Sequence, residues 1–180
     1  MNLIRKAKKK GLNITASTTP HHLTFIDHDL SDFDGTLRVN PPLRLKSDRK
    51  ALQVALENGT LDSVISDHRP ENIETHDVEF ILSPNGISGI EFVFAAVNTA
   101  CNNLDLSRLI DSISNATRRV YNIPEVHIEI NAPAKITWFD PVKEFNFQNI
   151  SGGANNPWPN RKLSGTVYGC LNGTKIHIND

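Results

Sequence analysis

The segment Ile65-Ser66-Asp67-His68-Arg69-Pro70 combines residue types that can do chemistry. An apolar run from Leu61 to Ile65 leads into it, and Pro70 favours neither a continuing strand nor a helix. An acidic side chain at the end of a buried parallel strand can act as a base or as a metal ligand, because barrel active sites lie at such strand ends. The same residues are also ordinary turn chemistry, so the fragment alone leaves both interpretations open.

Further motifs stand before and after this segment. In chain order they are Thr19-Pro20-His21-His22-Leu23, Asn40-Pro41-Pro42-Leu43-Arg44, Pro84-Asn85-Gly86-Ile87-Ser88-Gly89-Ile90-Glu91, Asn155-Asn156-Pro157-Trp158 and Leu163-Ser164-Gly165-Thr166-Val167. Together they resemble dihydroorotases, which are metal-dependent amidohydrolases. That family carries, in this order, a PHHL turn, an NPPLR loop, a DHAPH-like strand end, a GISGLE-like helix start, and closing NTPF and LxGxV segments. The resemblance covers nearly the whole chain.

The resemblance implies an α/β fold: the C-terminal portion of a (β/α)₈ TIM-type amidohydrolase barrel, followed by a small β-rich tail that would complete a β-sandwich. A full barrel takes roughly 250 residues, so 180 residues cannot hold it complete. The expected domains are a partial barrel over residues 1–133 and a β-rich segment over residues 134–180. The family's HxH pair, its carboxylated lysine or substitute aspartate, and its other metal histidines have no counterpart here. The chain is therefore expected to be the C-terminal part of the enzyme.

The pattern of apolar residues predicts alternating helices and strands in the first part. Helices are expected at residues 3–10, 48–58, 88–102 and 105–121, and strands at residues 12–17 and 61–66. Ser47 is a candidate cap for the second helix, and Gly59 follows its end. Continuous apolar strands that alternate with helices favour parallel pairing. Further on, strands are expected at residues 135–139, 165–171 and 175–178, with Asn172-Gly173 as a hairpin turn.

The resemblance also implies roles for single residues. Asp67 matches an aspartate that binds a metal, takes a proton from the attacking hydroxide and returns it to the leaving nitrogen. A carboxylate suits both proton transfers. Asn40 and the loop Pro84-Asn85-Gly86 match positions that contact the substrate ring. An ordinary loop residue at Asn40, and a turn before a helix cap at Ser88, are the structural alternatives.

Glu71 departs from the family's pattern. The DHAPH motif ends in a histidine that pairs with the substrate, whereas a carboxylate would repel the carboxylate of dihydroorotate at neutral pH. Glu71 therefore occupies a position that binds substrate in the family, but it places a negative charge where the family has a histidine. Either Asn72 or His76 replaces the missing histidine, or the substrate is a different ring.

Zinc is the cofactor that the resemblance implies, as a binuclear centre with most of its ligands absent from this chain. Asp67 is the metal ligand expected here. The adjacent His21 and His22, and His68 at the strand end, are expected to form structural hydrogen bonds instead, since the family's metal histidines match other positions.

Composition is that of an ordinary soluble domain. Hydrophobic residues make up 38% and charged residues 22%, and the net charge is −1, which disfavours disorder and nucleic-acid binding. No segment reaches the roughly 18 uninterrupted apolar residues of a membrane span. The basic N-terminal segment lacks the apolar region of a secretory signal. Cys101 and Cys170 stand far apart and predict free thiols in a reducing cytoplasm.

Three functions remain open at this point. The first is a dihydroorotase fragment that interconverts carbamoyl-aspartate and dihydroorotate in pyrimidine biosynthesis. The second is another cyclic amidohydrolase, acting on hydantoins or allantoin, which Glu71 allows. The third is a non-catalytic pseudo-dihydroorotase. The candidate partners are a small cyclic amide, a second copy of the chain, or aspartate transcarbamoylase, with no nucleic acid and no membrane.

Overall fold

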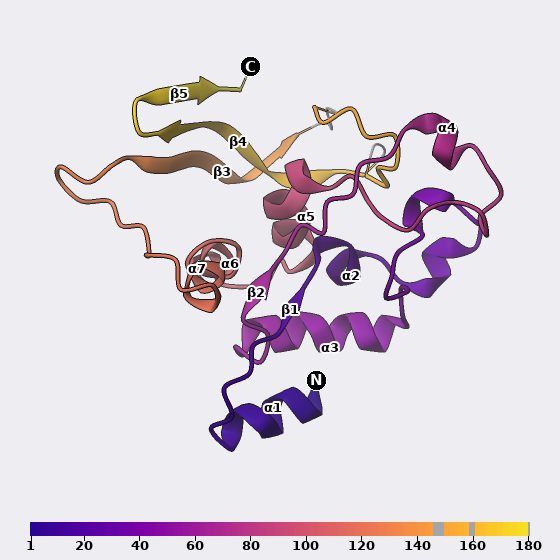
Figure 1. Cartoon of the computed structure of the whole chain (residues 1–180), viewed down its shortest axis with the longest axis horizontal. Helices are drawn as coiled ribbons and strands as arrows, with labels where there is room; N and C mark the ends of the chain where they lie inside the picture. Colours follow the sequence, from indigo (N-terminus) through magenta and orange to yellow (C-terminus); the bar gives the residue numbers. More distant parts are fainter. Residues whose placement is uncertain (146–149, 159–160, 180) are drawn as a thin grey trace.

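The computed structural model describes residues 1–145, 150–158 and 161–179, and shows a mixed α/β chain (Figure 1). Its helices are α1 (Asn2–Lys9), α2 (Pro20–Thr24), α3 (Lys46–Glu57), α4 (Ile73–His76), α5 (Val93–Ala100), α6 (Leu106–Ile113) and α7 (Asn115–Val120). Short 3₁₀ turns lie at Asp27–Leu30, Gly35–Leu37 and Ile90–Phe92. The strands are β1 (Ser17–Thr18), β2 (Ser63–Val64), β3 (Lys135–Phe145), β4 (Leu163–Asn172) and β5 (Lys175–Ile178).

Parallel pairing organises the first part of the chain, as predicted. Ser17 of β1 lies opposite Ser63 of β2, and a further parallel bridge joins His68 to Ile87. The strands are much shorter than the predicted ranges 12–17 and 61–66. A strand needs a hydrogen-bonded neighbour, and Leu12, which is 57% exposed, lies in the stretch before β1 where the described residues form no ladder. The described residues therefore hold a parallel strand pair without a closed barrel.

The helix boundaries differ from the predicted ones at several places. The predicted helix 88–102 is the shorter α5, which begins at Val93 after a 3₁₀ turn and ends at Ala100. The amides of Asp48 and Arg49 donate to the carbonyl of Leu45, so α3 begins before Ser47, and the predicted cap at Ser47 is wrong. The predicted helix 105–121 is two helices, because Ser114 breaks the helical backbone with φ −128° and ψ −91°. Gly59 does follow the end of α3, with φ +75°, as predicted.

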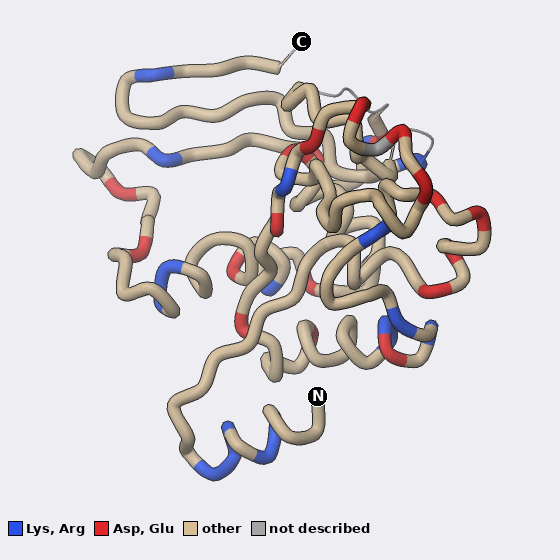
Figure 2. Tube along the Cα trace, turned by 45° about the vertical axis from the view of Figure 1, so that its right-hand side comes forward, with Lys and Arg blue, Asp and Glu red and all other residues tan. Residues whose placement is uncertain are grey.

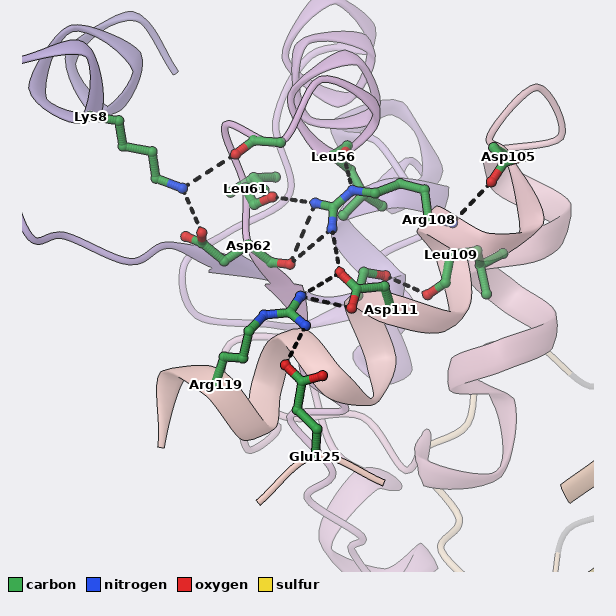
Figure 3. Close-up of polar contacts among 12 residues, drawn as sticks. Lys8, Leu56, Leu61, Asp62, Asp105, Arg108, Leu109, Asp111, Arg119 and Glu125 are labelled. Carbon is green, nitrogen blue, oxygen red and sulfur yellow. Dashed lines mark hydrogen bonds and ion pairs between the residues drawn. The ribbon is translucent and has the colours of Figure 1, made fainter. Parts of the chain in front are cut away.

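Arg108 of α6 joins the end of α3 to the start of β2 (Figure 3). Its Nε donates to the carbonyl of Leu56 at 2.9 Å, and its Nη2 donates to the carbonyl of Leu61 at 2.6 Å. Its Nη1 pairs with Asp111 at 3.3 Å, and Asp111 also pairs with Arg119 of α7 at 2.7 Å. The carbonyl of Leu56 also accepts from the amide of Gly59 at 3.4 Å, so Arg108 adds a second partner at the end of α3 and connects it to the segment that leads into β2.

Two buried clusters form the core. The first comprises Phe25, Leu37, Val39, Leu43, Ile87, Phe92, Ala95, Ala96, Trp158 and Leu163. The second comprises Leu23, Ala55, Leu56, Leu61, Val64, Val97, Cys101 and Leu109. Trp158 stacks on Phe92 with ring centroids 5.4 Å apart, and contacts Phe25 at 5.3 Å. The segment around Trp158 thus packs into the first part of the chain, while a domain boundary near residue 133 stays a prediction.

The C-terminal part forms the antiparallel sheet β3-β4-β5. Asn172 pairs with Lys175, so Gly173 and Thr174 make the turn and Gly173 takes a left-handed φ of +61°. The predicted hairpin is confirmed, one residue later than expected. The described residues show this one sheet at the C-terminal end and no second sheet stacked on it, so the β-sandwich is not seen.

The two cysteines are free, as predicted. Cys101 is buried, and burial raises the pKa of its thiol to about 11, whereas Cys170 is partly exposed. Among the described helices none is both long enough and apolar enough to span a bilayer.

His21 of α2 is a buried titratable residue, with 1% of its surface exposed. Neither ring nitrogen has a hydrogen-bond partner among the described residues, so the expectation that His21 forms structural hydrogen bonds is wrong. Burial, and to a lesser extent the charge of His22, lowers the pKa of His21 to about 3. The folded protein therefore holds this imidazole neutral, whereas the unfolded chain binds a proton near pH 6.5.

We predict that replacing Arg108 with Lys lowers the free energy of unfolding by about 1–3 kcal/mol, because an ammonium group cannot reach both carbonyls and Asp111 together. The matched control is Arg118→Lys, since Arg118 donates one exposed bond to Pro124 and should cost about 0.5 kcal/mol or less. Urea unfolding measures both variants. Equal losses would show that Arg108 makes no special contribution.

We also predict that acid destabilises the fold through His21. Because its pKa is lower in the folded state, its contribution to stability is complete above pH 6.5 and falls between pH 6.5 and 3, by at most about 1.4 kcal/mol per pH unit. His21→Phe should flatten this slope in urea titrations at pH 7, 6 and 5. The exposed His28, changed to Gln, should leave it unaltered. An unchanged slope in His21→Phe would contradict the prediction.

Candidate functional site

Asp67 lies three residues beyond the end of β2, directly before the parallel bridge between His68 and Ile87. Its backbone is left-handed with φ +45°, a conformation that Asp tolerates better than most residues. Its side chain is 25% exposed, and its Oδ1 is 3.3 Å from Nε of Arg69. The Arg69 amide in turn donates to the carbonyl of Ile87 at 2.9 Å. The sequence prediction did not single out Arg69, although its position two residues after Asp67 was the available indication.

His68 connects the strand end to the next element. Its Nδ1 accepts hydrogen bonds from the amides of Gly89 at 3.1 Å and Ile90 at 3.3 Å. A neutral imidazole that accepts at Nδ1 carries its proton on Nε2. The expectation that His68 forms structural hydrogen bonds is confirmed.

The loop Pro84-Asn85-Gly86 packs against the Asp67 loop. Gly86 has φ +147°, and a Cβ there would lie 2.6 Å from Cβ of Arg69. The Gly86 amide donates to the carbonyl of Arg38 at 2.9 Å. Glycine is thus required at position 86 because the backbone there lies against the side chain of Arg69. Asn85 is exposed and Pro84 is half-buried, so their roles toward a substrate stay predictions.

Ser88 does not cap the helix that follows it, contrary to expectation. The 3₁₀ turn Ile90–Phe92 begins after Gly89, and α5 follows that turn. The Ser88 side chain is buried, and its Oγ lies 2.9 Å from Oγ of Ser151. The hydroxyl is therefore used for contact with the C-terminal segment, which leaves the helix start without a side-chain cap.

The PHHL turn holds the loop that contains Asn40. His22 Nε2 donates to the carbonyl of Pro41 at 2.9 Å, while its Nδ1 accepts from Oγ1 of Thr19 at 2.7 Å. His22 is therefore a structural hydrogen-bonding residue, as predicted. Asn40 itself is exposed, and its side chain bonds to none of the described residues. Its substrate-binding role stays a prediction.

Glu71 is fixed by its backbone. Its amide is bonded to the side chain of Asn155 at 2.9 Å, and its carbonyl accepts from the amide of Ala154 at 2.9 Å. Its carboxylate forms no hydrogen bond or ion pair with the described residues. Asn72 is exposed, and the side chain of His76 lies outside the described part of the chain.

Acidic residues crowd the loops around the site. Figure 2 shows them gathered on the side of the molecule that carries α4, away from the basic α1. The set is Asp27, Asp29, Asp32, Asp34, Glu71, Glu74, Asp77 and Glu79. Of the nearby cations, Arg69 is paired with Asp67, and Arg38 lies 6.0 Å from the ring of Phe80. Asp29 is paired with Arg161 at 3.2 Å, whereas the other acidic side chains of this set form no ion pair with the described residues.

The described residues do not form a metal site by themselves. No group of three or more His, Cys, Asp or Glu side chains comes close enough in this part of the chain to hold an ion. Metal sites in proteins need several donors, and Asp67 is a single carboxylate. A cavity of about 540 Å³ opens beside the end of β2, and it is lined by Ile65, Ser66 and Glu91 among others.

A scan against models of protein families finds no match. Among curated proteins, the dihydroorotase of Syntrophus aciditrophicus is 36% identical over 174 residues, covering 93% of this chain and 40% of that protein. The dihydroorotase of Thermus aquaticus is 33% identical over 183 residues, covering 98% of this chain and 43% of that protein.

A solved dihydropyrimidinase from Brevibacillus agri has a similar fold, with a TM-score of 0.85 and 26% identity over 98% of this chain and 41% of that one. The chain thus spans about two fifths of the length of the relatives it matches. Over nearly its whole length it is similar to part of a dihydroorotase, as its motifs predict.

Proposed function

We propose that this chain forms the C-terminal part of the barrel and the adjoining β-rich tail of a dihydroorotase-type amidohydrolase. Such an enzyme interconverts carbamoyl-aspartate and dihydroorotate by opening and closing a cyclic amide. The observation that carries the proposal is Asp67, a partly exposed carboxylate just beyond the carboxyl end of the parallel strand β2. It stands within a chain that is 36% identical to one dihydroorotase and 33% to another.

The proposed chemistry of this chain centres on one carboxylate. Asp67 takes a proton from the attacking water and returns it to the ring nitrogen as the amide bond breaks, and Arg69 orients its carboxylate. Asn40 and the loop Pro84-Asn85-Gly86 hold the ring. Zinc enters the proposal through the family resemblance alone. Because no three His, Cys, Asp or Glu side chains come together among the described residues, the other zinc ligands would have to come from parts of the enzyme that this chain does not match.

Another cyclic amide is the second candidate substrate. Glu71 places a free carboxylate where the family has a histidine, and the neighbouring loops are acidic. An uncharged ring such as hydantoin avoids the repulsion that dihydroorotate would meet there. The similar fold of a dihydropyrimidinase is compatible with this substrate class.

We predict that a hybrid, in which this chain replaces the matching region of the Thermus aquaticus dihydroorotase, opens a cyclic amide. Asp67→Asn should lower its kcat by about 10²-fold or more, because one group serves both proton transfers. Asp77→Asn, an exposed acid that follows α4, is the matched control and should retain activity. Turnover is measured with dihydroorotate, hydantoin and allantoin.

Two results would count against the function. One is a hybrid that melts cooperatively yet turns over none of the three rings, which would favour a non-catalytic role. The other is a hybrid in which Asp67→Asn and Asp77→Asn are equally active.

We predict that Glu71→His in the same hybrid raises kcat/KM for dihydroorotate relative to hydantoin by about tenfold, because it removes one repelled carboxylate. Glu74→His, which changes an exposed acid of α4, controls for the general loss of negative charge. A fall in the ratio would show that Glu71 belongs to a pocket for another ring.

A further inference from the structure

The side chain of Asn155 is fully buried between two loops that carry candidate site residues. Its Nδ2 donates to the carbonyl of Arg69 at 2.7 Å and to the carbonyl of Gly86 at 3.0 Å. Its Oδ1 accepts from the amide of Glu71 at 2.9 Å. One amide group therefore bonds to the loop after Asp67 and to the loop that ends at Gly86.

Backbone bonds extend this connection on both sides. The Ser88 amide donates to the carbonyl of Asn155 at 3.0 Å, and the Gly86 amide donates to the carbonyl of Arg38 at 2.9 Å. Gly153 lies so close that a Cβ there would be 2.6 Å from Cβ of Ser88. The segment around Asn155 thus joins the Asp67 loop to the Gly86 loop, and the Gly86 amide connects that loop to Arg38, two residues before Asn40.

The chemistry of this position fits asparagine closely. Two donors and one acceptor are used together, and a primary amide of this length supplies them. An ionised aspartate would keep the acceptor but would face two carbonyl oxygens without a proton to donate. Because the site is buried, the lost bonds could not be replaced by water without opening the structure.

The adjacent Asn156 has a different role. It is also buried, but its Oδ1 accepts from the amide of Trp158 at 3.0 Å, and its Nδ2 has no partner among the described residues. Its contact is local to the turn. The two neighbouring asparagines therefore provide a matched pair in which only Asn155 reaches the site loops.

We propose that Asn155 is a positioning residue, whose side-chain amide sets the separation between the Asp67 loop and the Pro84-Asn85-Gly86 loop. It acts through Arg69, Glu71 and Gly86, with no contact to substrate. The catalytic consequence of this positioning rests on the function proposed above. The positioning itself does not depend on that function.

Amide hydrogen exchange of the full chain tests the positioning directly. Asn155→Asp should accelerate exchange at Arg69, Gly86 and Ser88 by about tenfold or more, and leave α3 unchanged. Asn156→Asp also buries a carboxylate, and should leave the three loop amides within about threefold of the parent. If Asn155→Asp does not fold, Asn155→Ser is measured in its place. Because serine retains one donor, exchange at the three loop amides should be faster than in the parent, by less than the tenfold expected for aspartate. Unchanged loop amides, or equal acceleration in the Asn156 variant, would overturn the proposal.

Kinetics of the hybrid enzyme separate positioning from stability. Both variants are assayed at temperatures equally far below their own melting temperatures. Under these conditions Asn155→Asp should raise KM by about tenfold or more relative to Asn156→Asp, since the displaced loops hold the ring. An unchanged KM with altered exchange would overturn the link to substrate binding. A hybrid that has no activity at all would refute the proposed function, while the exchange experiment would still decide the role of Asn155.

Discussion

Parallel pairing of consecutive segments is the constraint on which the rest of this structure depends. The pairs Ser17–Ser63 and His68–Ile87 align the segments in one direction, so their carboxyl ends meet at one edge. Loops that are far apart in sequence begin or end at that edge. Asp67 and the Gly86 loop become neighbours for this reason, because a parallel ladder brings successive strand ends to the same side.

Polar contacts hold the loops where the apolar core cannot. The core clusters include residues of β2 and α5 and hold these elements by apolar packing. Arg69 and Gly86 lie instead in irregular backbone, whose carbonyls need hydrogen-bond partners. Asn155 supplies them from a segment that Trp158 anchors in the core. A buried aromatic ring and a buried amide thus act together: burial of the ring fixes the segment, and the amide then fixes the loops.

Apolar side chains and a strand edge are exposed in this chain, which matches part of longer relatives. Apolar side chains such as Ile65 and Ile90 line an open cavity beside β2, and the hairpin strand β5 is exposed along its length. The relatives are more than twice as long as the matched region. The loops around α4 carry several acidic residues, Glu71 among them.

The sequence by itself determined the order of motifs, the family resemblance, the parallel pairing and the hairpin near Gly173, because periodicity, turn residues and strand-end chemistry are local properties. It could not determine the short length of β1, the break at Ser114, or the start of α3 before Ser47, since strand partners and helix packing decide these. The sequence could not predict the hydrogen bonds of Asn155 either. They join residues 69 to 86 positions apart, and only the tertiary structure decides which buried carbonyls face one amide.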